Sequence, residues 1–206
     1  LKFQEEYAYQ SFEDFILVIF VLVDDLYKKV APDSIKYRRN FDKALLSDSE
    51  IITIALCGEI IGVDSENAWY AFVKKNYRHL FPKMCERSQF NRTRRNLLQV
   101  TNLIFTHLAR QFADNIFIVD SFPLELAKSL PADIATRDIQ KATAIETTFS
   151  QMTEQLKAQR VLAKTFGELS LRLLTKFLAF NLCLLLALVV GVVYFTGKNF
   201  FLPPFW

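Results

Sequence analysis

Two acidic residues in the middle of the chain have the types and the local context that phosphoryl transfer requires. Asp120 follows a short apolar run at 116–119, and Glu146 comes 26 positions later in a stretch with helical spacing. A carboxylate at the end of a core strand and a second acid on a helix packed across it hold two divalent ions, about 4 Å apart, that activate a nucleophile. Asp120 and Glu146 are therefore candidate catalytic residues and candidate ligands of Mg²⁺, which prefers oxygen donors. The ordinary alternative is a turn-forming Asp and a solvent-exposed Glu.

A second set of residues is basic and lies on neighbouring predicted helices. Residues 72–96 contain eight Lys or Arg side chains and one acid, so this stretch carries +7 whereas the whole chain carries +3. In helix-turn-helix proteins the first turns of one helix contact base edges in the major groove, and other basic side chains bind phosphates. A solvated basic face is the alternative, because surface helices are commonly basic. The candidate DNA-binding residues are Lys74, Lys75, Arg78, Arg87, Asn91, Arg92, Arg94 and Arg95.

Apolar periodicity and capping signals predict the elements that position these side chains. Ser47 and Glu50 have the spacing of a capping box, which predicts that a helix begins there, and Gly62 is suited to end it. The polar and basic stretch 32–43 is predicted to be a loop, and 116–119 is the strand candidate. The predicted helices span about residues 11–30, 47–61, 65–81, 88–112 and 137–160, with a last helix from about 166.

Composition agrees with a helical fold and limits the class of function. Of the 206 residues 51% are hydrophobic, and 20 Phe with only 5 Gly favour packed helices over a turn-rich β fold. Cys57, Cys85 and Cys183 are far apart, and with His79 and His107 they match no recognised metal-binding spacing. We therefore expect neither a disulfide framework nor a zinc site. The acidic beginning of the chain lacks the features of a signal peptide, and we expect a reducing cytoplasm.

Several segments resemble the sequences of bacterial insertion-sequence transposases that have a DDE catalytic triad. The similar segments are 46–50, 64–83, 119–124, 145–151 and 180–186, and the resemblance extends over roughly residues 12–128 and 144–186. It implies a ribonuclease H-like α/β catalytic domain that cuts the ends of a mobile element and joins them to target DNA. In that family two Asp and one Glu hold Mg²⁺.

The triad that the resemblance implies is incomplete in this chain. By motif, Asp120 matches its first Asp and Glu146 matches its Glu, whereas the second Asp has no counterpart. The family places that residue after further strands and a helix, which need many tens of residues because strands run to about six residues and helices to about eleven. Only 25 residues lie between Asp120 and Glu146, and neither Asp133 nor Asp138 ends an apolar run. We interpret the chain as an internally deleted transposase that holds Mg²⁺ weakly and catalyses no strand transfer.

The sequence thus predicts a mainly α fold in three regions. Residues 1–112 form a helical DNA-binding-like region, and residues 113–186 form the remnant of a ribonuclease H-like α/β domain, with one strand and two C-terminal helices. Residues 187–206 form a divergent hydrophobic tail. The expected function is that of a defective transposase that binds element-end DNA in the bacterial cytoplasm, with a homo-oligomer left open.

The C-terminal region allows another function. Residues 177–195 are apolar over 19 positions apart from Asn181, and Lys176 and Lys198 flank them. A helix of that length is long enough to cross a bilayer. The first part of the segment, however, resembles the buried terminal helix of the transposase family. A small helical membrane protein anchored by residues 177–195 is the alternative to a core helix with a hydrophobic extension.

Overall fold

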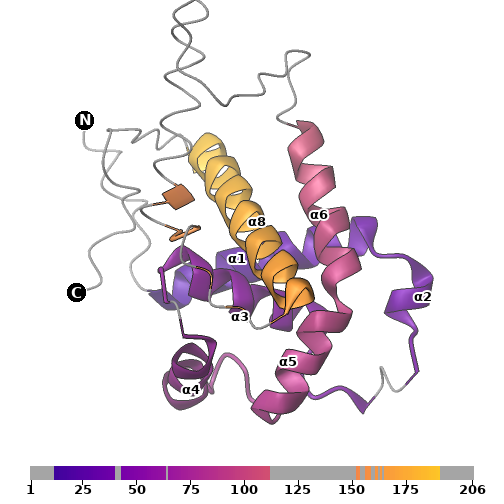
Figure 1. The fold of residues 1–206 in the computed structure, drawn as a ribbon, viewed down its shortest axis with the longest axis vertical. Helices are drawn as coiled ribbons and strands as arrows, with labels where there is room; N and C mark the ends of the chain where they lie inside the picture. Colours follow the sequence, from indigo (N-terminus) through magenta and orange to yellow (C-terminus); the bar gives the residue numbers. More distant parts are fainter. Residues whose placement is uncertain are drawn as a thin grey trace, which may run out of the picture.

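The computed structural model describes residues 12–39, 43–63, 65–111, 152–153, 156–158, 161, 163 and 165–190. Over these residues the chain is mainly helical and contains no strand, which confirms the mainly α fold class (Figure 1). The strand predicted at 116–119 lies outside the described residues. The ribonuclease H-like remnant therefore stays a prediction.

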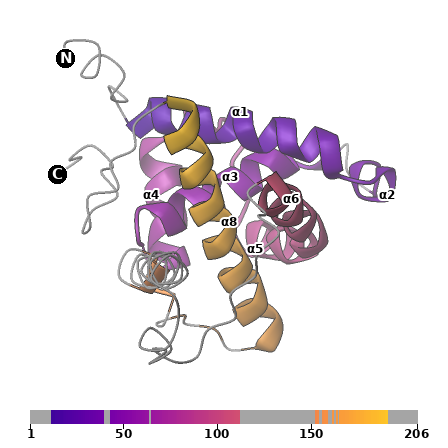
Figure 2. The same cartoon turned by 90° about the horizontal axis from the view of Figure 1, so that it is seen from above.

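The helices begin and end close to the predicted positions in most of the chain. In Figure 2, α1 (Phe12–Val30) runs along one edge of the helical body and α3 (Asp48–Ile60) lies beside it. The helices are α1 Phe12–Val30, α2 Asp33–Lys36, α3 Asp48–Ile60, α4 Glu66–Asn76, α5 Arg87–Asn96, α6 Leu98–Gln111 and α8 Phe166–Val190.

Helix α3 is the centre of the fold. All of its residues except Glu50 are buried, as expected of a helix that is apolar on every side. It packs against α1, α8, α5 and α4. The predicted capping box is confirmed, because the Ser47 side chain accepts a hydrogen bond from the Glu50 backbone while the Glu50 side chain accepts one from the Ser47 backbone. Gly62, just past the end of the helix, has a φ of 71°, which a residue with a side chain rarely adopts.

A buried carboxylate joins α3 to the chain before it. The Tyr27 hydroxyl on α1 donates a hydrogen bond of 2.7 Å to Asp48, and the Arg38 guanidinium forms an ion pair with the same carboxylate. These contacts hold residues 32–38 against the core. The prediction of a loop there was wrong for α2, because Pro32 takes the extended conformation of an N-cap and starts one short helical turn.

Helix α8 completes the core from the far end of the sequence. It lies beside α6 in Figure 1 and packs against both α3 and α6. Leu178, Ala179 and Leu182 are fully buried in that interface. Helices from both of the regions predicted at 1–112 and 113–186 therefore share one hydrophobic core.

Helix α8 also has the properties that raised the membrane alternative. It is the one helix, among the residues that the structure describes, that is long and apolar enough to cross a membrane. The candidate span is Phe166–Leu186, and half of its most apolar window is buried inside the protein. Arg172 and Lys176 lie within this span and are buried as well.

Three predicted helices end differently in the structure. The helix predicted over 65–81 ends at Asn76. The helix predicted over 88–112 is divided at Leu97, whose ψ near zero turns the chain so that α5 reaches α3 while α6 reaches α1 and α8. No Pro or Gly marks this turn, and burial of the Leu97 side chain holds it. The helix predicted over 137–160 does not extend to its expected end, because residues 156–158 are not helical and Lys157 has a φ of 50°. Most of that segment lies outside the described residues.

Candidate functional site

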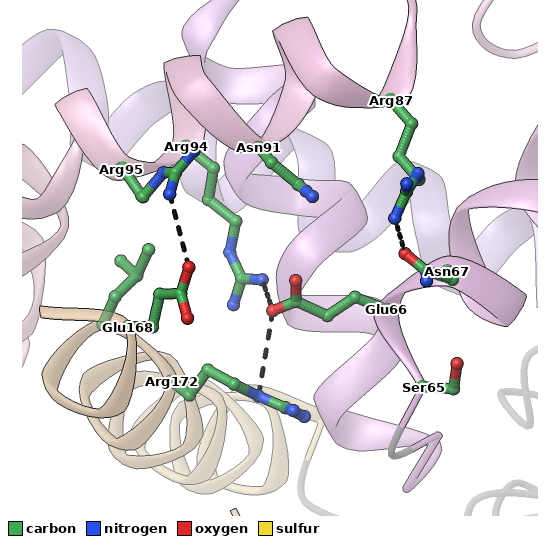
Figure 3. A pocket seen from close by; sticks show the side chains of 10 residues that line it. Ser65, Glu66, Asn67, Arg87, Asn91, Arg94, Arg95, Glu168 and Arg172 are labelled. Atoms are coloured by element: carbon green, nitrogen blue, oxygen red, sulfur yellow. Dashed lines mark hydrogen bonds and ion pairs between the residues drawn. The ribbon is translucent and has the colours of Figure 1, made fainter. Parts of the chain in front are cut away.

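A polar pocket of about 380 Å³ lies where the start of α4, one face of α5 and the first turns of α8 meet (Figure 3). Two aromatic contacts of α4 position the walls of the pocket. The Trp69 indole donates a hydrogen bond of 2.7 Å to the Ile54 carbonyl on α3, and the Tyr70 ring packs at a tilt against Phe90 of α5. Leu171 is the one apolar side chain among the described residues of the lining. The lining residues are Ser65, Glu66, Asn67, Arg87, Asn91, Arg94, Arg95, Glu168, Leu171 and Arg172.

The pocket collects four of the eight candidate DNA-binding residues. Arg87, Asn91, Arg94 and Arg95 follow one another at helical spacing on α5 and therefore lie on the same side of that helix. Figure 3 shows them above Glu66 of α4 and Arg172 of α8. The face predicted to contact DNA thus turns partly toward a pocket inside this protein.

Arg94 is the most enclosed of the four. Its side chain is 7% exposed and forms ion pairs with Glu66 and, at 3.8 Å, with Glu59. It also donates a hydrogen bond of 3.3 Å to the Thr175 hydroxyl on α8. Its Nε atom is buried and has no hydrogen-bond partner among the described residues. Arg94 therefore belongs to the wall of the pocket and is not on the outer surface with the other basic side chains.

Behind the wall, Glu59 of α3 anchors a buried cluster of charges. The Glu59 side chain is 4% exposed and accepts hydrogen bonds from Lys176 at 2.5 Å and from Arg172 at 3.4 Å. Lys176 also donates to the Leu156 carbonyl at 2.5 Å. Removal of charges from water is unfavourable unless they are paired, so these contacts hold α8 in one position against α3.

The rim of the pocket is more accessible to solvent. Arg95 forms an ion pair of 3.3 Å with Glu168, and the Arg95 side chain is 54% exposed. Arg87 is exposed and donates a hydrogen bond to the Asn67 side chain. Among the described residues, four arginines and two glutamates line the pocket, which leaves +2, and the underlying Lys176 and Glu59 cancel each other. The pocket is therefore electropositive and suited to an anion.

The other four candidate DNA-binding residues lie outside the pocket. Lys74, Lys75, Arg78 and Arg92 are all exposed. Lys74 has a weak ion pair with Glu86 at 3.9 Å. Together with the pocket residues they give α4, α5 and the loop between them a surface with many positive charges.

Sequence reasoning missed the acidic and the C-terminal members of this site. Glu59 is the one charged residue among the last ten positions of α3, and Arg172 and Lys176 stand four positions apart in α8, which is largely apolar. A charge inside an apolar helix signals a buried partner, and that signal was available. The pairing between them was not visible in the sequence.

The candidate catalytic and metal-binding residues Asp120 and Glu146 lie outside the described residues. Within the described part of the chain, no three His, Cys, Asp or Glu side chains are grouped so as to hold a metal ion. The assignment of Mg²⁺ to Asp120 and Glu146 stays a prediction. Comparison with protein-family models, with curated proteins and with solved structures found no match.

Proposed function

We propose that the chain is a defective insertion-sequence transposase that binds DNA and catalyses no strand transfer. The observation that carries this proposal is the concentration of exposed positive charge on α4 and α5. Of the eight basic residues between positions 72 and 96, Arg94 alone is buried, and Glu86 is the only acid among them. Such a surface binds the DNA backbone by displacing condensed counterions.

The exposed side chains divide by the contact that they suit. Lys74, Lys75 and Arg78 belong to α4 and the turn after it and suit phosphate contacts, which set the orientation of a protein on DNA. Arg92 is exposed on α5 and suits either a phosphate or a guanine base. Arg94 has no part in this contact because its guanidinium is occupied by Glu66 and Thr175.

Salt-dependent binding of element-end DNA tests this proposal. The slope of the logarithm of the binding constant against the logarithm of the salt concentration measures the number of phosphate contacts. We expect Lys75→Gln together with Arg78→Gln to reduce the magnitude of this slope by about two, because each lost phosphate contact accounts for roughly one unit. The matched control is Lys28→Gln with Lys29→Gln, which removes the same charge from exposed positions on α1. Equal effects of the two pairs would show that net charge, and not this surface, binds DNA.

The loss of catalysis has a separate test. Purified full-length protein incubated with element-end DNA and Mg²⁺ or Mn²⁺ is expected to give no joined product, since a centre built for three carboxylates retains two in this chain. Formation of joined product contradicts the proposed defect. It would mean that a third acid completes the site.

The membrane alternative is favoured by one observation, the length and apolar character of α8. Against it, Leu178 and Leu182 of that helix are buried on the protein core, and Lys176 is paired with Glu59 on α3. We therefore propose α8 as a core helix. Membrane fractionation followed by an alkaline wash is expected to leave the protein in the supernatant, and retention in the pellet without aggregation favours the anchor.

A further inference from the structure

We propose that the pocket between α4, α5 and α8 binds the phosphate monoester group of a nucleotide. Its lining carries four arginines and two glutamates, so two positive charges are without a negative counterpart in the lining. A phosphate monoester carries about −1.5 to −2 at neutral pH and matches that excess. Guanidinium groups bind phosphate oxygens through paired N–H donors, which gives geometric fit in addition to charge.

The inner arginines supply fixed positive charge to the pocket, while their terminal N–H groups are engaged by Glu59, Glu66 and Thr175. Arg94 is fixed by Glu66 and Thr175, and Arg172 is fixed by Glu59 at 3.4 Å. Both side chains are nine-tenths or more buried, and the Arg94 Nε atom has no hydrogen-bond partner within the described structure. Charges that are fixed in place before binding lose little entropy when the ligand arrives.

The rim arginines provide the adjustable part of the site. Arg95 forms a solvent-exposed ion pair with Glu168, and Arg87 donates a hydrogen bond to the neutral Asn67 side chain. Exposed ion pairs are weak, commonly below about 1 kcal/mol. Both arginines can therefore exchange these partners for a phosphate at small cost.

The size and lining of the pocket indicate a ligand larger than inorganic phosphate. A volume of about 380 Å³ lies within the range of small-molecule sites. Ser65, Asn67 and Asn91 add neutral donors and acceptors that suit a sugar hydroxyl or a base edge. Leu171 alone offers an apolar surface, which disfavours lipid-like ligands.

The phosphate can come from a free nucleotide or from the 5′-phosphorylated end of DNA. Both carry the same group, and the pocket lies on the α5 helix proposed to meet DNA. The DNA-end source rests on the proposed function, whereas binding of a free nucleotide does not. Titrations with the two kinds of ligand therefore test the two proposals separately.

Calorimetric titration of the full chain with dAMP, and with deoxyadenosine as the ligand that lacks the phosphate, tests the site. We expect dAMP to bind and deoxyadenosine to bind at least tenfold more weakly. Arg87→Gln with Arg95→Gln is expected to weaken dAMP binding roughly tenfold or more, since two charge-assisted hydrogen bonds are lost. Lys28→Gln with Lys29→Gln removes the same charge from exposed positions on α1, outside the pocket, and is expected to leave dAMP binding unchanged. Circular dichroism checks that each variant is folded.

Equal affinity for dAMP and deoxyadenosine, or equal effects of the two double variants, overturns the proposal. A second titration decides whether the phosphate belongs to a free nucleotide or to a DNA end. It uses oligonucleotides of one sequence that carry a 5′-phosphate or a 5′-hydroxyl. A phosphate preference that Arg87→Gln with Arg95→Gln abolishes assigns the site to a DNA end, and equal binding of the two oligonucleotides assigns it to a free nucleotide. Binding of dAMP without binding of DNA supports the site and contradicts only the proposed function.

Discussion

At the scale of single residues, Glu59 has the largest electrostatic role in the described structure. It is buried on α3 and contacts Arg94, Arg172 and Lys176, which come from α5 and α8. Three cations around one carboxylate are tolerated in the interior because Glu66 and Thr175 supply further partners to Arg94. The wall of the pocket and the position of α8 against α3 therefore depend on the same carboxylate.

Replacement of Glu59 by Gln tests this role. The change leaves Lys176 buried without the carboxylate that pairs with it and weakens the pairing of Arg172, which keeps an ion pair of 3.8 Å with Glu66, and we expect the free energy of unfolding to fall by about 3–5 kcal/mol. Urea denaturation measures the effect. Glu86→Gln is the control, because the Glu86 side chain is 83% exposed and its ion pair with Lys74 is long, at 3.9 Å. We expect this control to change the free energy of unfolding by less than about 0.5 kcal/mol. Comparable losses in the two variants would contradict the buried role of Glu59.

Two buried thiols give the stability a dependence on pH. Burial raises the pKa of Cys183 from 9.0 to about 12, and burial with a smaller contribution from Cys183 raises the pKa of Cys57 above its ordinary value. Above about pH 9 the unfolded chain loses thiol protons that the folded chain keeps, so the stability falls as the pH rises. The fall is about 1.4 kcal/mol per pH unit for each thiol.

Urea denaturation at about pH 9 and about pH 10 measures this slope. The variant Cys57→Ala with Cys183→Ala is expected to lose most of it, even though smaller side chains lower the stability at every pH. A slope that is the same in the variant and in the parent protein would assign the dependence to other groups. Burial also raises the pKa values of Tyr27, Tyr70 and Tyr77, but these residues lower the stability mainly above about pH 10, where tyrosines of the unfolded chain lose their protons.

At the scale of elements, the crossing of α3 and α4 requires a residue without a side chain. A Cβ atom at Gly58 would lie 2.6 Å from the Trp69 ring, and that ring donates a hydrogen bond to the Ile54 carbonyl on the same helix. The absence of a side chain therefore brings α4, and with it Ser65, Glu66 and Asn67, into position at the pocket.

Two glycine substitutions are expected to change the free energy of unfolding in opposite directions. Gly58→Ala displaces the Trp69 indole and is expected to lower the free energy of unfolding by roughly 1–3 kcal/mol, although alanine favours helices. Gly167→Ala, in the first turn of α8 with nothing within 4 Å of the added methyl group, is expected to raise it by about 0.5–1 kcal/mol. Denaturation followed by circular dichroism compares the two. Stabilisation by Gly58→Ala would mean that the α3–α4 crossing is loose.

At the scale of the whole molecule, α8 belongs to the same core as the helices of residues 12–111. Leu178 is fully buried among them. We expect Leu178→Ala to lower the stability by roughly 2–5 kcal/mol and to shift a single cooperative transition. Leu17→Ala, at a side chain on α1 that is 46% exposed, is the control and is expected to change it by about 0.5 kcal/mol or less. A transition that is insensitive to Leu178→Ala would indicate that α8 folds apart from the rest.

Much of the helical architecture was predictable, and the exceptions have physical causes. The capping box at Ser47 and the starts of α4 and α8 depend on side chains within one turn, which sequence patterns report directly. The division at Leu97 was not predictable, because no breaking residue marks it and only the burial of both flanking helices requires it. The short helix α2 likewise depends on the return of the chain to Asp48 through Arg38.

The sequence by itself determined the helical character of the described chain, the beginning of its central helix and the presence of a basic stretch on two successive segments. These are properties of neighbouring residues, since capping, apolar spacing and local charge all act over a few positions. Only the tertiary structure decided which charges meet, because Glu59 and Arg172 are 113 positions apart and come together through the packing of α8 on α3. That packing turns part of a basic helix face into one wall of an electropositive pocket and buries Arg94, whose type alone suggested a DNA contact.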